Sequence, residues 1–243
     1  MPTGSAAYRK LNRHVGKALH RYDMIQDGDR ILIGLSGGKD SLTLIWILSE
    51  RMRRVPVRYE LYGVYVDPGF ENGFSEALKT YCGDLGFPFQ VVHTDIGLKA
   101  HSAENRENPC FLCSWNRRKH LFEIAERLKC QKIALGHHKD DIIETLFMNI
   151  CYAGEIAGMM PRQTFFDGLF TVIRPLALVD ENLIQRFATE QRFPTFVNPC
   201  PSSKRSTRSQ VKDMLNRLYR SNPKIKGNIA HAIHRFHRND VPG

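Results

Sequence analysis

The chain has 243 residues, of which 42% are hydrophobic and 25% charged, and these proportions fit one soluble α/β domain with a small appendage. No run approaches the roughly 18 apolar residues of a membrane span, and the first residues lack the apolar core of a secretory signal, so we expect a cytoplasmic protein without a membrane anchor. The net charge of +10 favours polyanionic partners, although an ordinary basic protein could carry the same surplus.

Hydrophobic spacing predicts alternating helices and strands along the chain. Apolar residues recur at helical spacing over 8–25, and the pattern breaks at Asp27-Gly28-Asp29. A run of β-branched residues and leucine at 30–35 predicts a buried strand, and residues 41–54 predict a helix. The alternation then repeats. Further strands are predicted at 59–67, 89–94, 132–136 and 170–176, and further helices at 74–85, 114–128, 140 to about 151, and from about 180 onward.

This regular succession predicts an α/β fold with a doubly wound, mainly parallel sheet. The carboxyl ends of its strands should meet at one edge, where ligands bind in such sheets. We expect an N-terminal helical segment at 1–28, a central domain at 29–200 and a basic helical tail at 201–243. From Pro201 onward ten Lys or Arg stand against two Asp, which favours a nucleic-acid partner.

The loop after the first predicted strand reads Ser-Gly-Gly-Lys-Asp-Ser, residues 36–41. A Walker loop is excluded because Asp40 follows Lys39, and the dinucleotide fingerprint is excluded because Ser36 replaces its second glycine. Two glycines before a helix still suit a phosphate, because the helix opens with unpaired N–H groups. A turn required only by backbone conformation is the alternative, and we favour phosphate binding.

The same six residues resemble the S-G-G-x-D-S pyrophosphate loop of the ATP pyrophosphatases, the nucleotide alpha-hydrolase superfamily. The resemblance implies a central domain that splits ATP between its α and β phosphates and adenylates a substrate atom. It implies that Asp40 positions Mg²⁺ or braces the loop. The ATP-binding residues that it implies in the loop are Ser36, Gly37, Gly38, Lys39, Asp40 and Ser41.

The six cysteines suggest a metal or redox centre, because no export signal argues for disulfides. Cys110 and Cys113 form a C-x-x-C pair, and Cys200 lies between prolines about ninety residues on. A zinc site would usually add a second C-x-x-C, and a thioredoxin-type pair would open a helix directly after a strand. Three thiolates fit an iron–sulfur cube with one open iron. The other cysteines, at 82, 130 and 151, are typical of small core residues.

Longer segments resemble the tRNA 2-thiocytidine synthetase family over residues 8 to about 215. They read, in order, MIQDGDRILIGLSGGKDS, PCFLCSWNRRKHLFEIAERLKCQKIALGHHKDDIIETLFMN, VIRPLALV and FPTFVNPCPSS. The resemblance implies a [4Fe–4S] cluster on Cys110, Cys113 and Cys200, whose open iron carries the sulfur to be transferred. Many relatives continue the last segment as Cys-x-x-Cys-Gly-Ser-Gln, whereas here Cys200 is the one candidate ligand. The absence of zinc-finger cysteines at both ends favours the cytidine branch over the uridine branch.

Other polar residues also fall at predicted strand ends. In Gly136-His-His-Lys-Asp-Asp141, the two carboxylates suit Mg²⁺ held against phosphate, and the resemblance favours Asp141. The alternative for Asp140 is a helix N-cap, and the histidine pair is typical of hydrogen-bonded structure. Gly136 belongs with the nucleotide-binding residues. The resemblance also implies that the adenine lies at the end of the second strand, at Val64 and Val66.

Cations follow the C-x-x-C pair by one helical turn. Arg117, Arg118 and Lys119 could offset the charge of a thiolate cluster or contact the RNA backbone, and a solvated helix face is the alternative. Arg174 could reach a phosphate or pair with a neighbouring acid.

The resemblance implies an ATP-dependent tRNA sulfurtransferase that replaces the C2 oxygen of a cytidine, at position 32, by sulfur. Its implied partners are tRNA and a cysteine-desulfurase-type sulfur donor, and a homodimer is plausible. Two alternatives remain open. One is another adenylating tRNA-modifying enzyme, a 2-thiouridine synthase or a lysidine-type ligase. The other is a non-catalytic RNA-binding protein.

Overall fold

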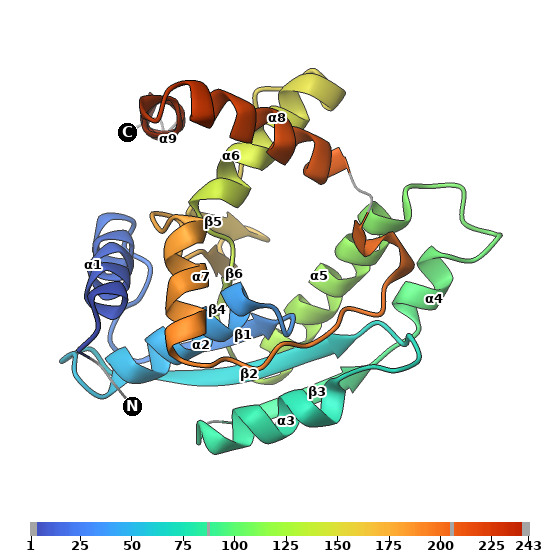
Figure 1. Ribbon diagram of the computed structural model, residues 1–243. Coiled ribbons are helices and arrows are strands. Elements are labelled where there is room, and N and C mark those ends of the chain that lie inside the picture. Colours follow the sequence, from blue (N-terminus) through green and yellow to red (C-terminus); the bar gives the residue numbers. More distant parts are fainter. Residues whose placement is uncertain (1–3, 87, 205–206, 240–243) are drawn as a thin grey trace.

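The fold is a six-stranded sheet between two layers of helices (Figure 1). The computed structural model describes residues 4–86, 88–204 and 207–239. Strand order is β3-β2-β1-β4-β6-β5, and every neighbouring pair is parallel except the antiparallel β5–β6 pair. The strands are β1 (Asp29–Leu35), β2 (Tyr59–Asp67), β3 (Phe89–His93), β4 (Lys132–Leu135), β5 (Arg162–Phe165) and β6 (Phe170–Ile173).

Helices cover both faces of the sheet, which confirms the predicted doubly wound α/β class. One core packs α1, α2, α3 and α7 against one face, and a second core packs α5 against the other. A third apolar cluster joins α6, α8 and α9. The helices are α1 (Ala6–Arg21), α2 (Lys39–Met52), α3 (Ser75–Asp84), α4 (Ile96–Ala100), α5 (Pro109–Arg127), α6 (Lys139–Met148), α7 (Glu181–Glu190), α8 (Thr207–Ser221) and α9 (Lys224–Asn239).

Three features differ from the sequence prediction. Strand β5 and the short helix α4 were not predicted, because neither stretch has a clear apolar period. Helix α5 begins at Pro109 and not at residue 114. The reason is local, because the side chain of Asn108 accepts hydrogen bonds from the N–H groups of Cys110 and Phe111 and so caps the helix before its apolar period starts. Both cysteines of the C-x-x-C pair therefore lie in helix.

Helix α6 ends at Met148, and the chain continues as a π-helical turn, η1 (Asn149–Ala153). A 3₁₀ turn, η2 (Pro201–Lys204), precedes the two basic C-terminal helices. Within the described ranges the predicted tail is helical, while residues 1–3, 205–206 and 240–243 of the two predicted terminal segments lie outside them. None of the helices in the described ranges is long and apolar enough to cross a membrane.

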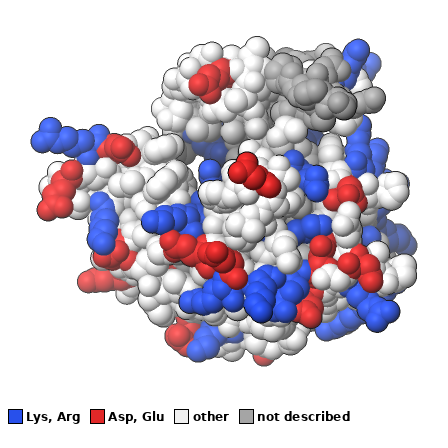
Figure 2. All heavy atoms as spheres, turned by 180° about the vertical axis from the view of Figure 1, so that it is seen from behind, with Lys and Arg blue, Asp and Glu red and all other residues white. Residues whose placement is uncertain are grey.

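Charge is mixed on the face of the molecule shown in Figure 2. Lys and Arg side chains alternate there with Asp and Glu, and no large area of one sign is visible on that face. The charge surplus of the sequence therefore does not produce a basic surface there.

Phe187 is central to the larger core. Its side chain is fully buried, and its ring lies 4.9 Å from the Trp46 ring and 5.8 Å from the Phe193 ring, between centroids. We predict that Phe187→Ala lowers the free energy of unfolding by about 3–5 kcal/mol, because it removes buried surface and leaves a cavity. Chemical denaturation measures this. The control, Leu218→Ala on the exposed side of α8, should stay within about 0.5 kcal/mol of the wild type, and equal losses would contradict the assignment.

Candidate functional site

A pocket of about 540 Å³ lies at the carboxyl ends of β1 and β4, the neighbouring strands from which the chain winds in opposite directions. Such a switch point leaves a crevice, because the loops after the two strands turn to opposite faces. The predicted site residues that line this pocket are Ser36, Asp40, Ser41, Val64, Val66, Arg117, Gly136 and Asp141. Gly37, Gly38, Lys39 and the three candidate cysteines are not among its lining residues.

The loop between β1 and α2 is folded around its serines. The N–H of Ser36 donates to Oγ of Ser41 at 3.2 Å, and that hydroxyl donates to the carbonyl of Gly38 at 2.9 Å. Gly37 has a φ of +75°, and a Cβ there would overlap the Phe74 ring. Gly38 caps α2 without any side-chain hydrogen bond, so the first N–H groups of the helix have no side-chain cap. This is the local geometry of an anion seat.

The loop after β4 touches the same helix start. A Cβ on Gly136 would lie 3.0 Å from N of Ser41 and 3.1 Å from C of Asp40. A side chain there would push the two loops apart. Gly136 is therefore needed for the close approach of backbones, which brings residues 136–141 against the first turn of α2.

Several buried polar atoms in the pocket wall make no hydrogen bond within the described residues. Within the described residues, Oδ1 of Asp40, Nδ1 of His137 and Nε of Arg174 are buried without a hydrogen bond, although Nζ of Lys39 lies 3.3 Å from the Asp40 atom. All three residues line the pocket. Because buried polar groups are almost always hydrogen-bonded, this wall is suited to a polar ligand.

Burial also shifts the pKa values of these groups. It raises the pKa of Asp40, although the charges of Lys39 and His138 oppose the rise. Burial, aided by the charge of Arg174, lowers the pKa of His137 to about 4, so His137 is neutral at pH 7. Burial and the charge of Arg118 lower the pKa of Arg174 to about 10. An anion between Arg118 and Arg174 would relieve their repulsion.

Asp141 has two roles in the structure. Its Oδ2 accepts the N–H of His138 at 2.9 Å while Nδ1 of His138 accepts the N–H of Asp141, a capping box that starts α6. Its Oδ1 accepts from Nη1 of Arg208 on α8 at 3.1 Å. His138 is thus hydrogen-bonded structure, as predicted. The N-cap of α6 is His138 and not Asp140, whose Oδ2 accepts the N–H of Glu181 and joins α6 to α7.

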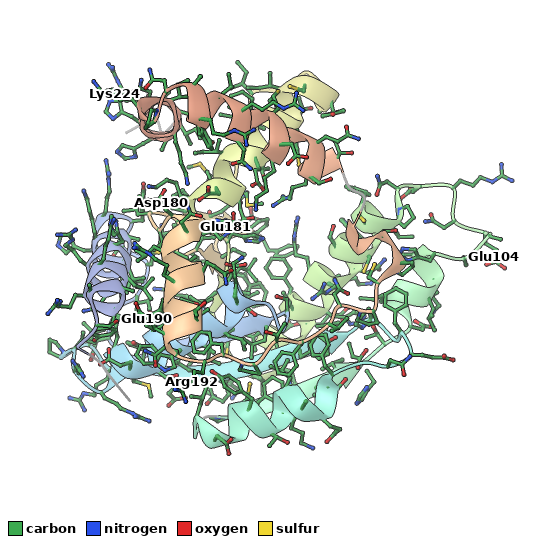
Figure 3. The ribbon with its side chains drawn as sticks, viewed as in Figure 1. Glu104, Asp180, Glu181, Glu190, Arg192 and Lys224 are labelled. Carbon is green, nitrogen blue, oxygen red and sulfur yellow. The ribbon has the colours of Figure 1, made fainter. Side chains whose placement is uncertain are left out.

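Cations from the C-terminal helices contact a row of carboxylates beside the pocket. Nζ of Lys212 lies 2.6 Å from Glu181, and Nζ of Lys226 lies 2.5 Å from Asp140 and 3.0 Å from Asp180. Figure 3 shows Asp180 and Glu181 at the end of α7 nearest α8, opposite the end with Glu190 and Arg192. With Arg208, three cations of the predicted RNA-binding tail are therefore paired within the chain.

Lys39 belongs to the same network. Its Nζ lies 3.3 Å from Asp40 and 3.2 Å from Glu181. Both carboxylates therefore offset the positive charge of Lys39, which we expected to be available for a phosphate. Burial would lower the pKa of Lys39, but Asp40 and Glu181 outweigh it and raise that pKa. Glu144 is 4% exposed, and burial together with the charge of Asp141 raises its pKa to about 7.

The three candidate cysteines come together from two distant segments. Burial raises the pKa of the Cys113 thiol, Arg117 opposes the rise, and the nearby Cys200 and Cys110 add to it. Sγ of Cys200 lies 3.9 Å from Nε2 of His101. In the described part of the chain, no group of three His, Cys, Asp or Glu side chains could hold one metal ion. A cluster of several irons takes one thiolate per iron, so the donor set suits an iron–sulfur cluster.

Two of the other cysteines agree with the sequence interpretation, since Cys82 and Cys130 are buried. Cys151 is exposed, so its assignment to the core was wrong; it lies in η1, where the helix no longer packs on the body. Sequence reasoning missed Arg208, Lys212 and Lys226 as partners of the carboxylates. No local signal could have found them, because each pairs with a residue at least 31 positions away.

Comparisons with known proteins agree with this geometry. Residues 7–218 match the PP-loop domain family. A tRNA-cytidine(32) 2-sulfurtransferase of Geobacter sulfurreducens is 38% identical over 229 residues, 93% of this chain and 89% of that protein. The protein of the same name from Photorhabdus laumondii is 42% identical over 212 residues, 85% of this chain and 68% of that protein.

Solved structures share the fold. The U34-tRNA thiolase NcsA from Methanococcus maripaludis, with its [4Fe–4S] cluster, is similar with a TM-score of 0.81 and 27% identity, over 98% of this chain and 80% of that one. An NH3-dependent NAD synthetase from Campylobacter jejuni has a TM-score of 0.53 at 13% identity, over 99% of each chain, and shows the fold alone.

The pairing of Lys212 with Glu181 predicts a pH dependence of stability. Burial would raise the pKa of Glu181, but Lys212 and Lys39 lower it to about 2. A lowered pKa adds stability above the unfolded value of 4.5 that is lost as pH falls toward 2. Lys212→Met should therefore cost about 1 kcal/mol near pH 7, a difference that shrinks below pH 4.5. Denaturation at several pH values measures this. The control is Arg217→Met on the exposed side of α8, and a difference independent of pH would contradict the pairing.

Proposed function

The chain belongs to the PP-loop domain family and to the tRNA-cytidine(32) 2-sulfurtransferases within it, and we propose that it thiolates cytidine 32 of tRNA at the expense of ATP. The observation that carries the proposal is one pocket with two halves. A phosphate-type loop forms one side, and α5 lines the other side through Ser114, Arg117 and Arg118, directly after Cys110 and Cys113. A non-catalytic RNA-binding protein would need neither half.

In this proposal ATP lies along the carboxyl ends of β1 and β2. The adenine packs on Val64 and Val66, which are buried in the pocket wall. The pyrophosphate lies on residues 36–41, where the N–H groups at the start of α2 donate to its oxygens. Arg174 neutralises part of the phosphate charge, since its Nε is buried without a partner within the described residues.

Asp40 and Asp141 fit a magnesium ion, because carboxylates joined by phosphate oxygens are its usual ligands. Oδ1 of Asp40 lacks a hydrogen bond within the described ranges, and Asp141 faces the same pocket. When bound, Mg²⁺ supplies a Lewis acid that stabilises charge on the phosphates. Arg208 neutralises Asp141 in its absence.

Cys110, Cys113 and Cys200 would hold the [4Fe–4S] cluster, and the donor set fits it. When bound, this cluster would carry the sulfur that replaces the C2 oxygen of the cytidine. Arg117 favours the thiolate form of Cys113, because its positive charge lowers the pKa that burial raises. The positive end of α5, where Cys110 and Cys113 lie, favours thiolates in the same way.

The proposed reaction has two steps, adenylation of the cytidine and replacement of its C2 oxygen by sulfur. The C2 oxygen of the cytidine attacks the α-phosphate, the bond to pyrophosphate breaks, and N–H donors of the loop stabilise the leaving charge. Sulfur replaces the adenylated oxygen, and AMP leaves with that oxygen. To reach the pocket, the base must unstack from the anticodon loop.

The proposal also includes a cysteine-desulfurase-type protein as the sulfur donor, a homodimer as the assembly and the cytoplasm as the setting. It divides the chain into a helical segment at 1–28, a PP-loop domain at 29–200 and a basic tail at 201–243. The proposed action on tRNA supports the cytoplasm as the setting. The three cysteines support a sulfur donor, because a cluster that carries sulfur to the substrate has to be resupplied.

The direct test is mass spectrometry of tRNA nucleosides after incubation with anaerobically purified protein, ATP, Mg²⁺ and sulfide. We expect 2-thiocytidine and release of pyrophosphate. If 2-thiouridine appeared instead, the uridine branch would replace the cytidine branch. Pyrophosphate release without any thiolated nucleoside would overturn the proposal and favour a ligase.

Cys110→Ala should remove the cluster and abolish thiolation, because one of the three thiolates is lost. ATP binding should persist, since Cys110 does not line the pocket. Iron content, visible absorption and nucleoside analysis measure these effects. Cys151→Ala is the matched control, because Cys151 is exposed on η1 and outside the site, so it should keep iron and activity. Full thiolation by Cys110→Ala would refute the cluster assignment.

Gly37→Ala should weaken ATP binding roughly tenfold or more, because the left-handed φ and the Phe74 ring both oppose a side chain there. Isothermal titration with ATP measures this. The control Gly83→Ala lies on α3, where a Cβ would meet no atom within 4 Å, and its ATP affinity should match the wild type. An unchanged affinity in Gly37→Ala would argue against the loop as the phosphate seat.

A further inference from the structure

The exposed face of the first half of α5 carries an aromatic pair. Phe111 is 61% exposed and Trp115 is 53% exposed. Residues four apart lie on the same side of a helix, with about 5–6 Å between their Cβ atoms. The exposed positions of this half of the helix form one stripe: Cys110, Phe111, Ser114, Trp115, Arg118 and Lys119. A single exposed aromatic is ordinary, but this stripe joins a thiol, two aromatics and two cations.

The stripe is continuous with the pocket. Ser114 and Arg118 line the pocket, and Cys110 stands at the start of the stripe. A polymer that places one of its units in the pocket can therefore lay the neighbouring units on α5. The aromatic pair lies where those neighbouring units would be.

The chemistry of the stripe suits unpaired nucleotides. Flat aromatic side chains stack on bases of any sequence, and cations beside them bind the phosphates. Lys119 is available for this, because its side chain is 62% exposed and lies 3.9 Å from Glu123, a contact too loose to hold it firmly. Arg118 adds a second cation on the pocket side.

A protein partner fits the stripe less well. A specific protein interface buries about 800 Å² on each side and has an apolar centre. Two aromatic side chains flanked by Ser114, Arg118 and Lys119 do not form a continuous apolar surface of that size. Charge and shape both favour RNA over a second copy of the chain.

We propose that Phe111 and Trp115 form a stacking platform for unpaired bases that neighbour the target nucleotide. This rests on the proposed function, in which the substrate is the anticodon loop of a tRNA. The platform holds the strand while the target base enters the pocket. It selects for unpaired loops, because bases inside a duplex cannot offer their faces to a side chain.

The chain itself provides a probe, because it has two tryptophans and only Trp115 is exposed; Trp46 is 4% exposed in the core. We expect an RNA hairpin with an unpaired loop to quench the emission of Trp115, and a fully paired RNA of equal length to quench it far less. The titration uses no ATP, so it reports binding alone. Equal quenching by the two RNAs would overturn the selection for unpaired bases.

Variants separate the platform from the catalytic site. Anisotropy of labelled hairpin RNA should show binding weakened roughly tenfold or more by Trp115→Ala, and similarly by Phe111→Ala, with Trp115→Phe close to the wild type. The control is Leu169→Ala, because Leu169 is 58% exposed, lies outside α5 and is not among the residues that line the pocket. ATP affinity and iron content should be unchanged in all four variants.

The outcomes distinguish the two proposals. If Trp115→Ala binds the hairpin as tightly as the wild type, the platform is refuted, even where tRNA is thiolated normally. If Trp115→Ala loses only sulfur delivery from a persulfide-carrying protein, the stripe is a protein-docking surface and the platform is refuted. If the wild type binds the hairpin through Trp115 but thiolates no tRNA, the proposed function fails and the platform stands.

Discussion

The contact between Gly136 and the first turn of α2 is the constraint on which the candidate site depends. Backbone atoms of Asp40 and Ser41 lie so close that any side chain at 136 would separate the two loops. This contact fixes the loop that suits a phosphate against the segment that carries Asp141. The parallel sheet brings two strand ends to one edge, but the missing side chain lets their loops meet there.

Much of the fold could be predicted because its signals are local. Strand β2 has the predicted bounds, since its apolar run ends sharply at Asp67. The start of α5 depended on the side chain of Asn108 and not on apolar spacing, so it was predicted too late. Strand β5 has only four residues and pairs at the edge of the sheet, so no periodic pattern could reveal it.

The candidate site also contains features with a local sequence signal and features without one. That residues of the loop, Gly136 and Asp141 would meet at one pocket could be predicted, because each lies in a short motif at a strand end. The partners of the carboxylates could not, because α8 and α9 are distant in sequence and only the packing of α6, α8 and α9 brings them close. Lys39 is not among the residues that line the pocket, and its Nζ pairs with Asp40 on α2 and Glu181 on α7.

The pairing of Arg208, Lys212 and Lys226 with carboxylates also bears on how salt should affect RNA binding. Cations release condensed counterions from RNA only where they neutralise phosphates, with a slope of about −0.7 in log affinity per phosphate for single strands. These three cations are already neutralised inside the chain and contribute little to that slope. The salt dependence should therefore report cations outside this network, such as Arg118 and the loosely held Lys119 on α5, and fall short of what the net charge of +10 suggests.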